Sequence, residues 1–164
     1  MSATARDQIP SDPALADPHR EALYDAEHDA SPEGGRRFTR FAHLEQYVQD
    51  VVLGAWWERT FPDAPIEVDV LRRSRSATFS AAHVPPERDA AVVWIRDGSW
   101  DQVTLVHELA HVATGSVDRT GPHGARFATT LLICWRELLG MHAYGALRSA
   151  LDAHGVPYQR DRLG

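Results

Sequence analysis

The amino-acid sequence predicts an α+β fold in which a small sheet lies between helical segments in chain order. Over residues 38–60, apolar side chains recur at three- and four-residue steps, the period of an amphipathic helix. Strand-like patterns follow at 66–71, 77–81 and 90–95. From Ser99 onward helical patterns return and continue almost to the C-terminus. We therefore expect one N-terminal helix, a three-stranded sheet and three further helices.

The first 36 residues differ in composition from the rest of the chain. Residues 1–18 are rich in Ala, Asp and Pro, which predicts a disordered arm. A short helix is expected at 18–29, anchored by Leu23 and Tyr24, and the chain is then broken by Ser31–Gly35. Residues 1–36 are thus interpreted as a flexible N-terminal arm that includes a short helix, and residues 37–164 as the folded domain.

The predicted sheet follows the helix over 38–60, which Phe61–Pro65 ends. The run at 66–71 alternates apolar and acidic side chains, as a half-buried strand does. The run at 77–81 is weaker, and the one at 90–95 is bounded by prolines before it and Asp-Gly after it. Short connections favour a mostly antiparallel meander. The arginines between the first two runs are interpreted as a solvated turn: Arg72, Arg73 and Arg75.

Three helices are expected after the sheet. Ser99 is the predicted N-cap of the first, with Asp101 in its first turn, and this helix ends at Thr114 before Gly115. A loop over 116–122 leads to a second helix at 123–139, and a third is expected at 143–154.

Composition excludes several functional classes. The formal net charge is −6 and the pI is about 5.8, which argues against nucleic acid as a partner because such binding depends on clustered basic residues. The single cysteine, Cys134, cannot form an intrachain disulfide and is interpreted as a buried packing thiol. No apolar run approaches the roughly 18 residues of a membrane span. Residues 1–7 lack a secretory apolar stretch, so we expect a cytoplasmic protein of undetermined oligomeric state.

The motif that indicates chemistry is His107-Glu108-Leu109-Ala110-His111. Histidines four residues apart on a helix share one face, so two imidazoles can bind one Zn²⁺. Glu108 is rotated by about 100° from His107, which suits a general base acting on water better than a third ligand.

The surroundings of the motif strengthen this interpretation. The neighbouring residues of the helix, 104–106, 109–110 and 112–113, are all uncharged, which predicts a helix buried nearly all round. Buried ionisable groups are costly unless paired or metal-bound. The alternative is a hydrogen-bonded polar cluster on a structural helix. A third zinc ligand is expected at His123, twelve residues after His111 in a Gly-Pro-His-Gly segment. For that residue the alternative is a helix-capping or solvent-facing histidine.

His-Glu-Leu-Ala-His followed by Pro-His-Gly-x-x-Phe resembles the SprT-like (Spartan-type) zincin metalloproteases over about residues 104–127. Over about 18–155, the layout is similar to a family of small metallohydrolases found in actinobacteria and named from their HExxH motif. The resemblance implies a zincin-like fold, ligands His107, His111 and His123, and Glu108 as the catalytic residue. No second zinc module and no basic tail follow, so a DNA-linked role is not expected.

The resemblance also implies a mechanism, the hydrolysis of a peptide or protein by zinc-activated water with Glu108 as general base. In zincins a strand borders the cleft and can pair with an extended substrate, and the strand at 90–95 is the candidate here. Tyr144 and Tyr158 are candidates for stabilising the oxyanion, a role that some zincins give to Tyr or His.

Two other functions stay open on the sequence alone. One is a non-catalytic zinc-binding domain that binds a protein partner, against which the intact Glu108 argues because structural zinc sites need no base. The other is a metallohydrolase that acts on a non-peptide amide. The sequence does not separate this second possibility from a peptidase.

Overall fold

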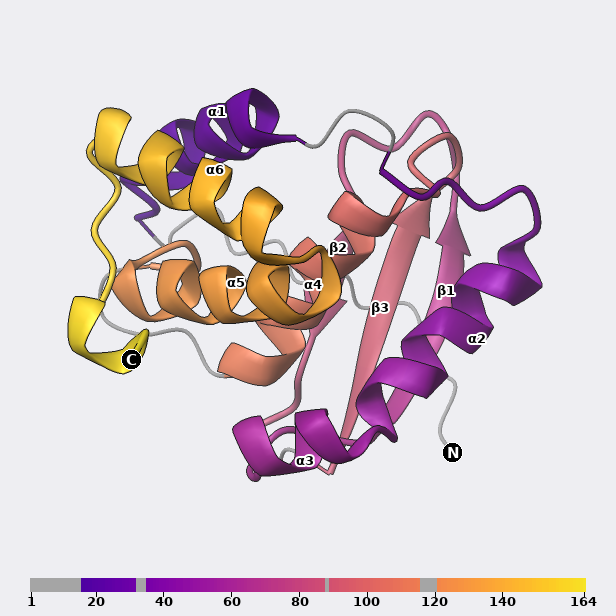
Figure 1. Cartoon of the computed structure of the whole chain (residues 1–164). Helices are drawn as coiled ribbons and strands as arrows, with labels where there is room; N and C mark the ends of the chain where they lie inside the picture. Colours follow the sequence, from indigo (N-terminus) through magenta and orange to yellow (C-terminus); the bar gives the residue numbers. More distant parts are fainter. Residues whose placement is uncertain (1–15, 32–34, 88, 116–120) are drawn as a thin grey trace. The chain divides into compact units, whose positions relative to one another are not determined.

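The structure is a computed structural model that describes residues 16–31, 35–87, 89–115 and 121–164. Within these ranges the chain is α+β, as predicted, with six α-helices, one short 3-10 helix and a three-stranded mixed sheet. The chain divides into two compact units (Figure 1). The first unit lies within Arg37–Ser116, and the second combines residues within Pro13–Arg36 and Val117–Gly164.

The first unit holds the sheet and three helices. Its elements are α2 (Phe41–Val52), α3 (Ala55–Thr60), β1 (Glu67–Arg73), β2 (Ala81–His83), β3 (Ala90–Arg96) and α4 (Gln102–Thr114).

The single helix predicted over 38–60 is wrong, because α2 and α3 are separate helices. The chain leaves the helical conformation at Gly54, whose φ of −75° and ψ of 144° are extended. Glycine has a low helix propensity, which favours a break at this position. A Cβ atom added there would lie 3.1 Å from the carbonyl oxygen of Asp50, so a larger residue would crowd the end of α2.

The sheet is mixed, and the predicted antiparallel meander is wrong. The strand order is β1-β3-β2, with β1 parallel to β3 from Glu67↔Ala90 to Arg73↔Arg96 and β2 antiparallel to β3. A parallel pair needs a connection of about a dozen residues or more. The segment between β1 and β3 is long enough for this crossover and contains the three residues of β2. The weak strand expected at 77–81 forms later, at Ala81–His83.

Burial explains which strand is central. In β1, Val68 and Val70 are buried and alternate with more exposed residues, as expected for a half-buried strand. In β3 the consecutive residues Val93, Trp94 and Ile95 are all buried, which is typical of an interior strand. Helix α2 packs against β1, and α4 packs against β2 and β3.

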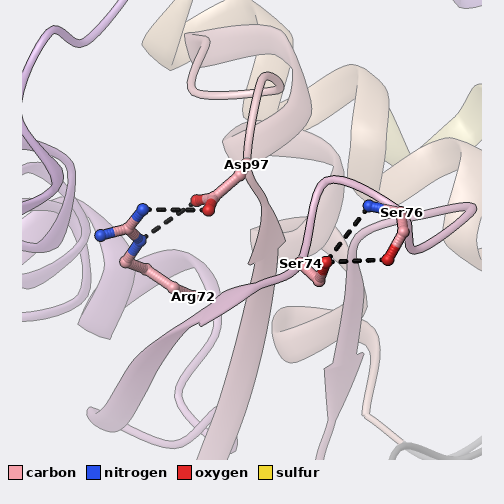
Figure 2. A network of polar contacts seen from close by, with 4 residues as sticks. All are labelled: Arg72, Ser74, Ser76 and Asp97. Carbon is pink, nitrogen blue, oxygen red and sulfur yellow. Dashed lines mark hydrogen bonds and ion pairs between the residues drawn. The ribbon is translucent and has the colours of Figure 1, made fainter.

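The ends of β1 and β3 are joined by an ion pair. The Nε and Nη2 atoms of Arg72 donate to the two carboxylate oxygens of Asp97, at 3.1 and 2.9 Å, as Figure 2 shows. This contact lowers the pKa of Asp97 and raises that of Arg72. In the turn after β1, the hydroxyls of Ser74 and Ser76 lie 2.8 Å apart. The basic run was expected to be a turn, but its first two arginines, Arg72 and Arg73, lie in β1.

The second unit is helical. Its elements are α1 (Arg20–Ala30), α5 (Ala125–Leu138), α6 (Met141–Ala153) and the 3-10 helix η1 (Arg160–Arg162). Helix α6 packs against both α1 and α5 (Figure 1). Gly140, with φ of +95°, separates α5 from α6 as predicted. The C-terminal segment returns to α5, where Arg136 donates to the Leu163 carbonyl at 2.8 Å.

The segment before the first unit is described only in part. Residues 1–15, most of the predicted disordered arm, lie outside the described residues. The short helix expected at 18–29 is confirmed as α1, with Leu23 and Ala26 buried. This helix belongs to the second unit, although it precedes the first in the chain. No helix within the described ranges is long and apolar enough to cross a membrane.

Candidate metal centre

Helix α4 carries the motif and begins at a different cap from the one expected. The N-cap is Asp101, not Ser99: its carboxylate accepts from the backbone N–H of Thr104 at 2.9 Å and from the Thr104 hydroxyl at 3.1 Å. Asp101 is extended, with φ of −130°, whereas the backbone N–H of Ser99 closes a turn onto the carbonyl of Arg96. The helix ends as predicted, at Thr114 before Gly115 with φ of +73°.

The expectation that α4 is buried nearly all round is confirmed. From position 105 to 114 every residue is buried except His111, which is half-buried. The apolar residues Leu105, Val106 and Leu109 have no exposed surface. The same helix buries two ionisable side chains, His107 at 5% exposed and Glu108 at 4%. Burying such groups is costly unless they are paired or metal-bound, and the alternative of a hydrogen-bonded polar cluster stays open for these two side chains.

His107 and His111 face one another along α4. Their ring centroids are 5.0 Å apart and the rings are inclined by 70°. The imidazole nitrogens that this i, i+4 pair could offer to one ion lie within 4.8 Å of each other. Glu108 is the next residue along the helix, so its side chain leaves the axis in a different direction. Imidazole nitrogens are ligands for transition metals, whereas Mg²⁺ and Ca²⁺ prefer oxygen ligands.

His123 lies in the second unit, in the loop that leads into α5. Gly121 has φ of +96°, its carbonyl accepts from the N–H of Gly124 at 3.2 Å, and Gly124 is the extended N-cap of α5. The His123 side chain is 5% exposed. Its ring packs against Tyr24 of α1, with 5.4 Å between centroids, and against Phe127 of α5, with 5.0 Å. The alternative of a solvent-facing histidine is therefore wrong, while the assignment as third ligand stays a prediction.

One partner of His123 was not predicted from the sequence. The carboxylate of Asp17 lies 2.6 Å from the His123 Nδ1 atom, and the two side chains are 15% and 7% exposed. Asp17 belongs to the segment interpreted as a disordered arm, and 106 residues separate it from His123. No local pattern links residues so far apart, so nothing in the sequence indicated this pair.

The two tyrosines proposed for the oxyanion lie in the second unit. Tyr144 is buried in α6, with the Arg136 guanidinium carbon 5.9 Å from its ring centroid. The Tyr158 hydroxyl donates to Asp152 at 3.0 Å and accepts from Arg148 at 3.4 Å. This last contact is the main reason why the pKa of Arg148 is raised. The oxyanion roles of both tyrosines stay predictions.

Cys134 has the environment expected of a packing thiol. It lies in α5 without exposed surface, and burial raises its pKa well above the ordinary range. A nucleophilic cysteine needs the opposite environment, with a lowered pKa and access to solvent. Thiol catalysis is therefore excluded at this position.

Comparisons with protein-family models, with curated proteins and with solved structures found no match to this chain.

Proposed function

We propose that this chain is a zinc-dependent metallohydrolase with a zincin-like fold, and most specifically a metallopeptidase. The observation that carries the proposal is the pair His107 and His111 on one face of α4, beside a buried Glu108. His123 is proposed as the third ligand, which leaves the fourth position of a tetrahedral zinc for water. Each of the three histidines can offer one imidazole nitrogen as a metal ligand.

Each of these residues has a defined role in the proposal. Zinc, when bound, supplies a water of lowered pKa and polarises the scissile carbonyl. Glu108 accepts the proton of the attacking water and delivers it to the leaving amine. Its burial in α4 shields the side chain from bulk water. A non-catalytic zinc domain would need no carboxylate at this position, and the buried Glu108 therefore favours an enzyme.

The strand that would pair with a substrate is not the one expected from the sequence. Strand β3 is the interior strand of the sheet and pairs with both β1 and β2, so it offers no free edge along Val92–Trp94. Strand β2 is at an edge of the sheet and packs against α4. We therefore propose the outer edge of β2, Ala81–His83, as the site where an extended peptide adds by β-augmentation.

The first test compares the wild-type protein with Glu108→Gln, which keeps the shape of the side chain and removes its basicity. We expect the variant to bind zinc in the wild-type ratio and to lose on the order of 10²–10⁴ in turnover of a peptide library. Glu137→Gln is the matched control, because Glu137 is an exposed residue of α5 and its change removes the same charge. Unchanged turnover in Glu108→Gln would refute the mechanism.

The same assays separate the alternatives. His107→Ala and His111→Ala should each lose zinc, as measured by elemental analysis after gel filtration. A wild-type protein that binds zinc and cleaves no peptide, but hydrolyses simple amides, would be a non-peptide amidohydrolase. Zinc binding without any hydrolysis would instead support a zinc domain that binds a protein partner.

A further inference from the structure

Asp17 and His123 form a largely buried ion pair, with side chains 15% and 7% exposed. The carboxylate Oδ2 lies 2.6 Å from Nδ1 of the imidazole. The other carboxylate oxygen, Oδ1, is buried and has no hydrogen-bond partner in the described structure. Within the described residues, the carboxylate of Asp17 therefore has the His123 imidazole as its hydrogen-bond partner.

The loop before His123 is shaped to admit Asp17. A Cβ atom added at Gly121 would lie 2.5 Å from the carbonyl oxygen of Ala16 and 3.2 Å from the Cα of Asp17. Only glycine permits so close an approach of the two backbones, and its φ of +96° is also one that other residues rarely adopt. The backbones of both segments therefore fix where the carboxylate meets the imidazole.

The contact decides which nitrogen of His123 is available. A carboxylate at Nδ1 accepts the Nδ1–H and selects the tautomer in which Nε2 carries a lone pair. Tyr24 and Phe127 pack on the same ring and limit its rotation. Metal-binding histidines commonly donate their second ring nitrogen to a carboxylate in this way, which orients the ring and raises its basicity.

We propose that Asp17 is a positioning residue that holds His123 with Nε2 as its metal-binding atom. This inference rests on the proposed function, because it takes His123 as a zinc ligand. Asp17, which precedes α1 in the chain, would act on the proposed metal centre only through the His123 imidazole and would not bind the metal itself.

A second histidine–aspartate pair in the same unit provides a matched control. Asp29, near the end of α1, contacts His154 with 2.7 Å between Oδ2 and Nε2. Both pairs join the segment around α1 to the C-terminal part of the chain. The Asp29 pair is more exposed, with the side chains 60% and 28% exposed, and His154 is not a proposed ligand. Loss of either pair removes one anchor of the segment, but only loss of Asp17 affects His123.

The experiment measures the zinc dissociation constant by competition with a chromophoric chelator. We expect Asp17→Ala to raise it about 10–100-fold, the range seen when such supporting partners are removed. Asp17→Asn should recover most of the loss, because the amide oxygen still accepts from Nδ1–H, and Asp29→Ala should match wild type. Wild-type affinity in Asp17→Ala, or an equal loss in Asp29→Ala, would overturn the inference. Circular dichroism and thermal unfolding of the metal-free variants check that each is folded.

A second measurement needs no metal. Imidazole ¹⁵N chemical shifts of metal-free protein should show His123 protonated at Nδ1 in wild type and in Asp29→Ala, and a mixture of tautomers in Asp17→Ala. A wild-type His123 protonated at Nε2 would refute the inference directly. His123→Ala distinguishes a failure of the Asp17 role from a failure of the proposed zinc ligands. If it loses zinc while Asp17→Ala does not, only the role of Asp17 fails. If it binds zinc like wild type, the proposed ligand set fails as well.

Discussion

Replacement of Asp101 by alanine tests how α4, the helix that carries the motif, begins. Asp101 accepts from the Thr104 backbone N–H at 2.9 Å and from its hydroxyl at 3.1 Å. The change leaves this N–H of the first turn without its cap, and it removes a negative charge from the positive end of the helix dipole. Ser99 makes no side-chain hydrogen bond to the first turn in the described structure, so Ser99→Ala removes neither effect.

The size of the effect follows from these two contributions. Loss of the capping bond costs about 1 kcal/mol. Loss of the charge near the N-terminus of the helix costs about 0.3–1 kcal/mol. We therefore expect Asp101→Ala to lower the free energy of unfolding by about 1–2 kcal/mol, or roughly 2–8 °C in Tm. Asp101→Asn keeps an acceptor of similar shape and should lose only the charge contribution.

Urea unfolding followed by far-ultraviolet circular dichroism measures these differences, with equal m-values required for the comparison. The expected order of stability is wild type and Ser99→Ala together, then Asp101→Asn, then Asp101→Ala. If Ser99→Ala were as destabilising as Asp101→Ala, the helix would be capped by Ser99 and the assignment of Asp101 as its N-cap would be wrong.

Two further predictions concern the second unit. Because burial raises the pKa of the Cys134 thiol, thiol reagents should label it only in the unfolded protein. Above pH of about 8.5 the thiol ionises only in the unfolded state, so the unfolding free energy should fall by up to about 1.4 kcal/mol per pH unit, a decline that Cys134→Ala should remove. Gly145 lies within α6 and a Cβ atom there would contact nothing within 4 Å, so Gly145→Ala should stabilise the protein by about 0.5–1 kcal/mol in urea unfolding. A Cβ atom at Gly140 would also contact nothing within 4 Å, but the φ of Gly140 is +95°, which alanine rarely adopts, so Gly140→Ala should not stabilise the protein. A gain in stability from Gly140→Ala would contradict this reasoning.

The local elements were largely predictable from the sequence, whereas their pairing was not. Helical periodicity and a terminal glycine located the end of α4 at Thr114 and that of α5 near Gly140. The same periodicity concealed the break at Gly54, because the apolar stripe continues from α2 into α3 across it. A strand pattern shows that a strand exists and not which strand it joins, so the parallel pairing of β1 with β3 was missed.

The candidate site likewise combines residues that could be predicted from the sequence with a contact that could not. His107, Glu108 and His111 are close in sequence, and helix geometry alone places the two histidines on one face. The contact between Asp17 and His123 depends on two loops 106 residues apart and on the close approach that Gly121 allows. Contacts of this kind arise from tertiary structure, and a single sequence carries no signal for them.

The division of the second unit between the two ends of the chain has a consequence during synthesis. Helix α1 ends at Ala30, and its packing partner α6 begins 111 positions later, at Met141. At translation rates of about 5–20 residues per second, α1 leaves the ribosome roughly 6–22 seconds before α6 is made. All residues of the first unit have been synthesised before α6 is made. Leu23 and Ala26, which are buried in the folded protein, therefore cannot gain the packing of α1 against α6 until the last helices emerge.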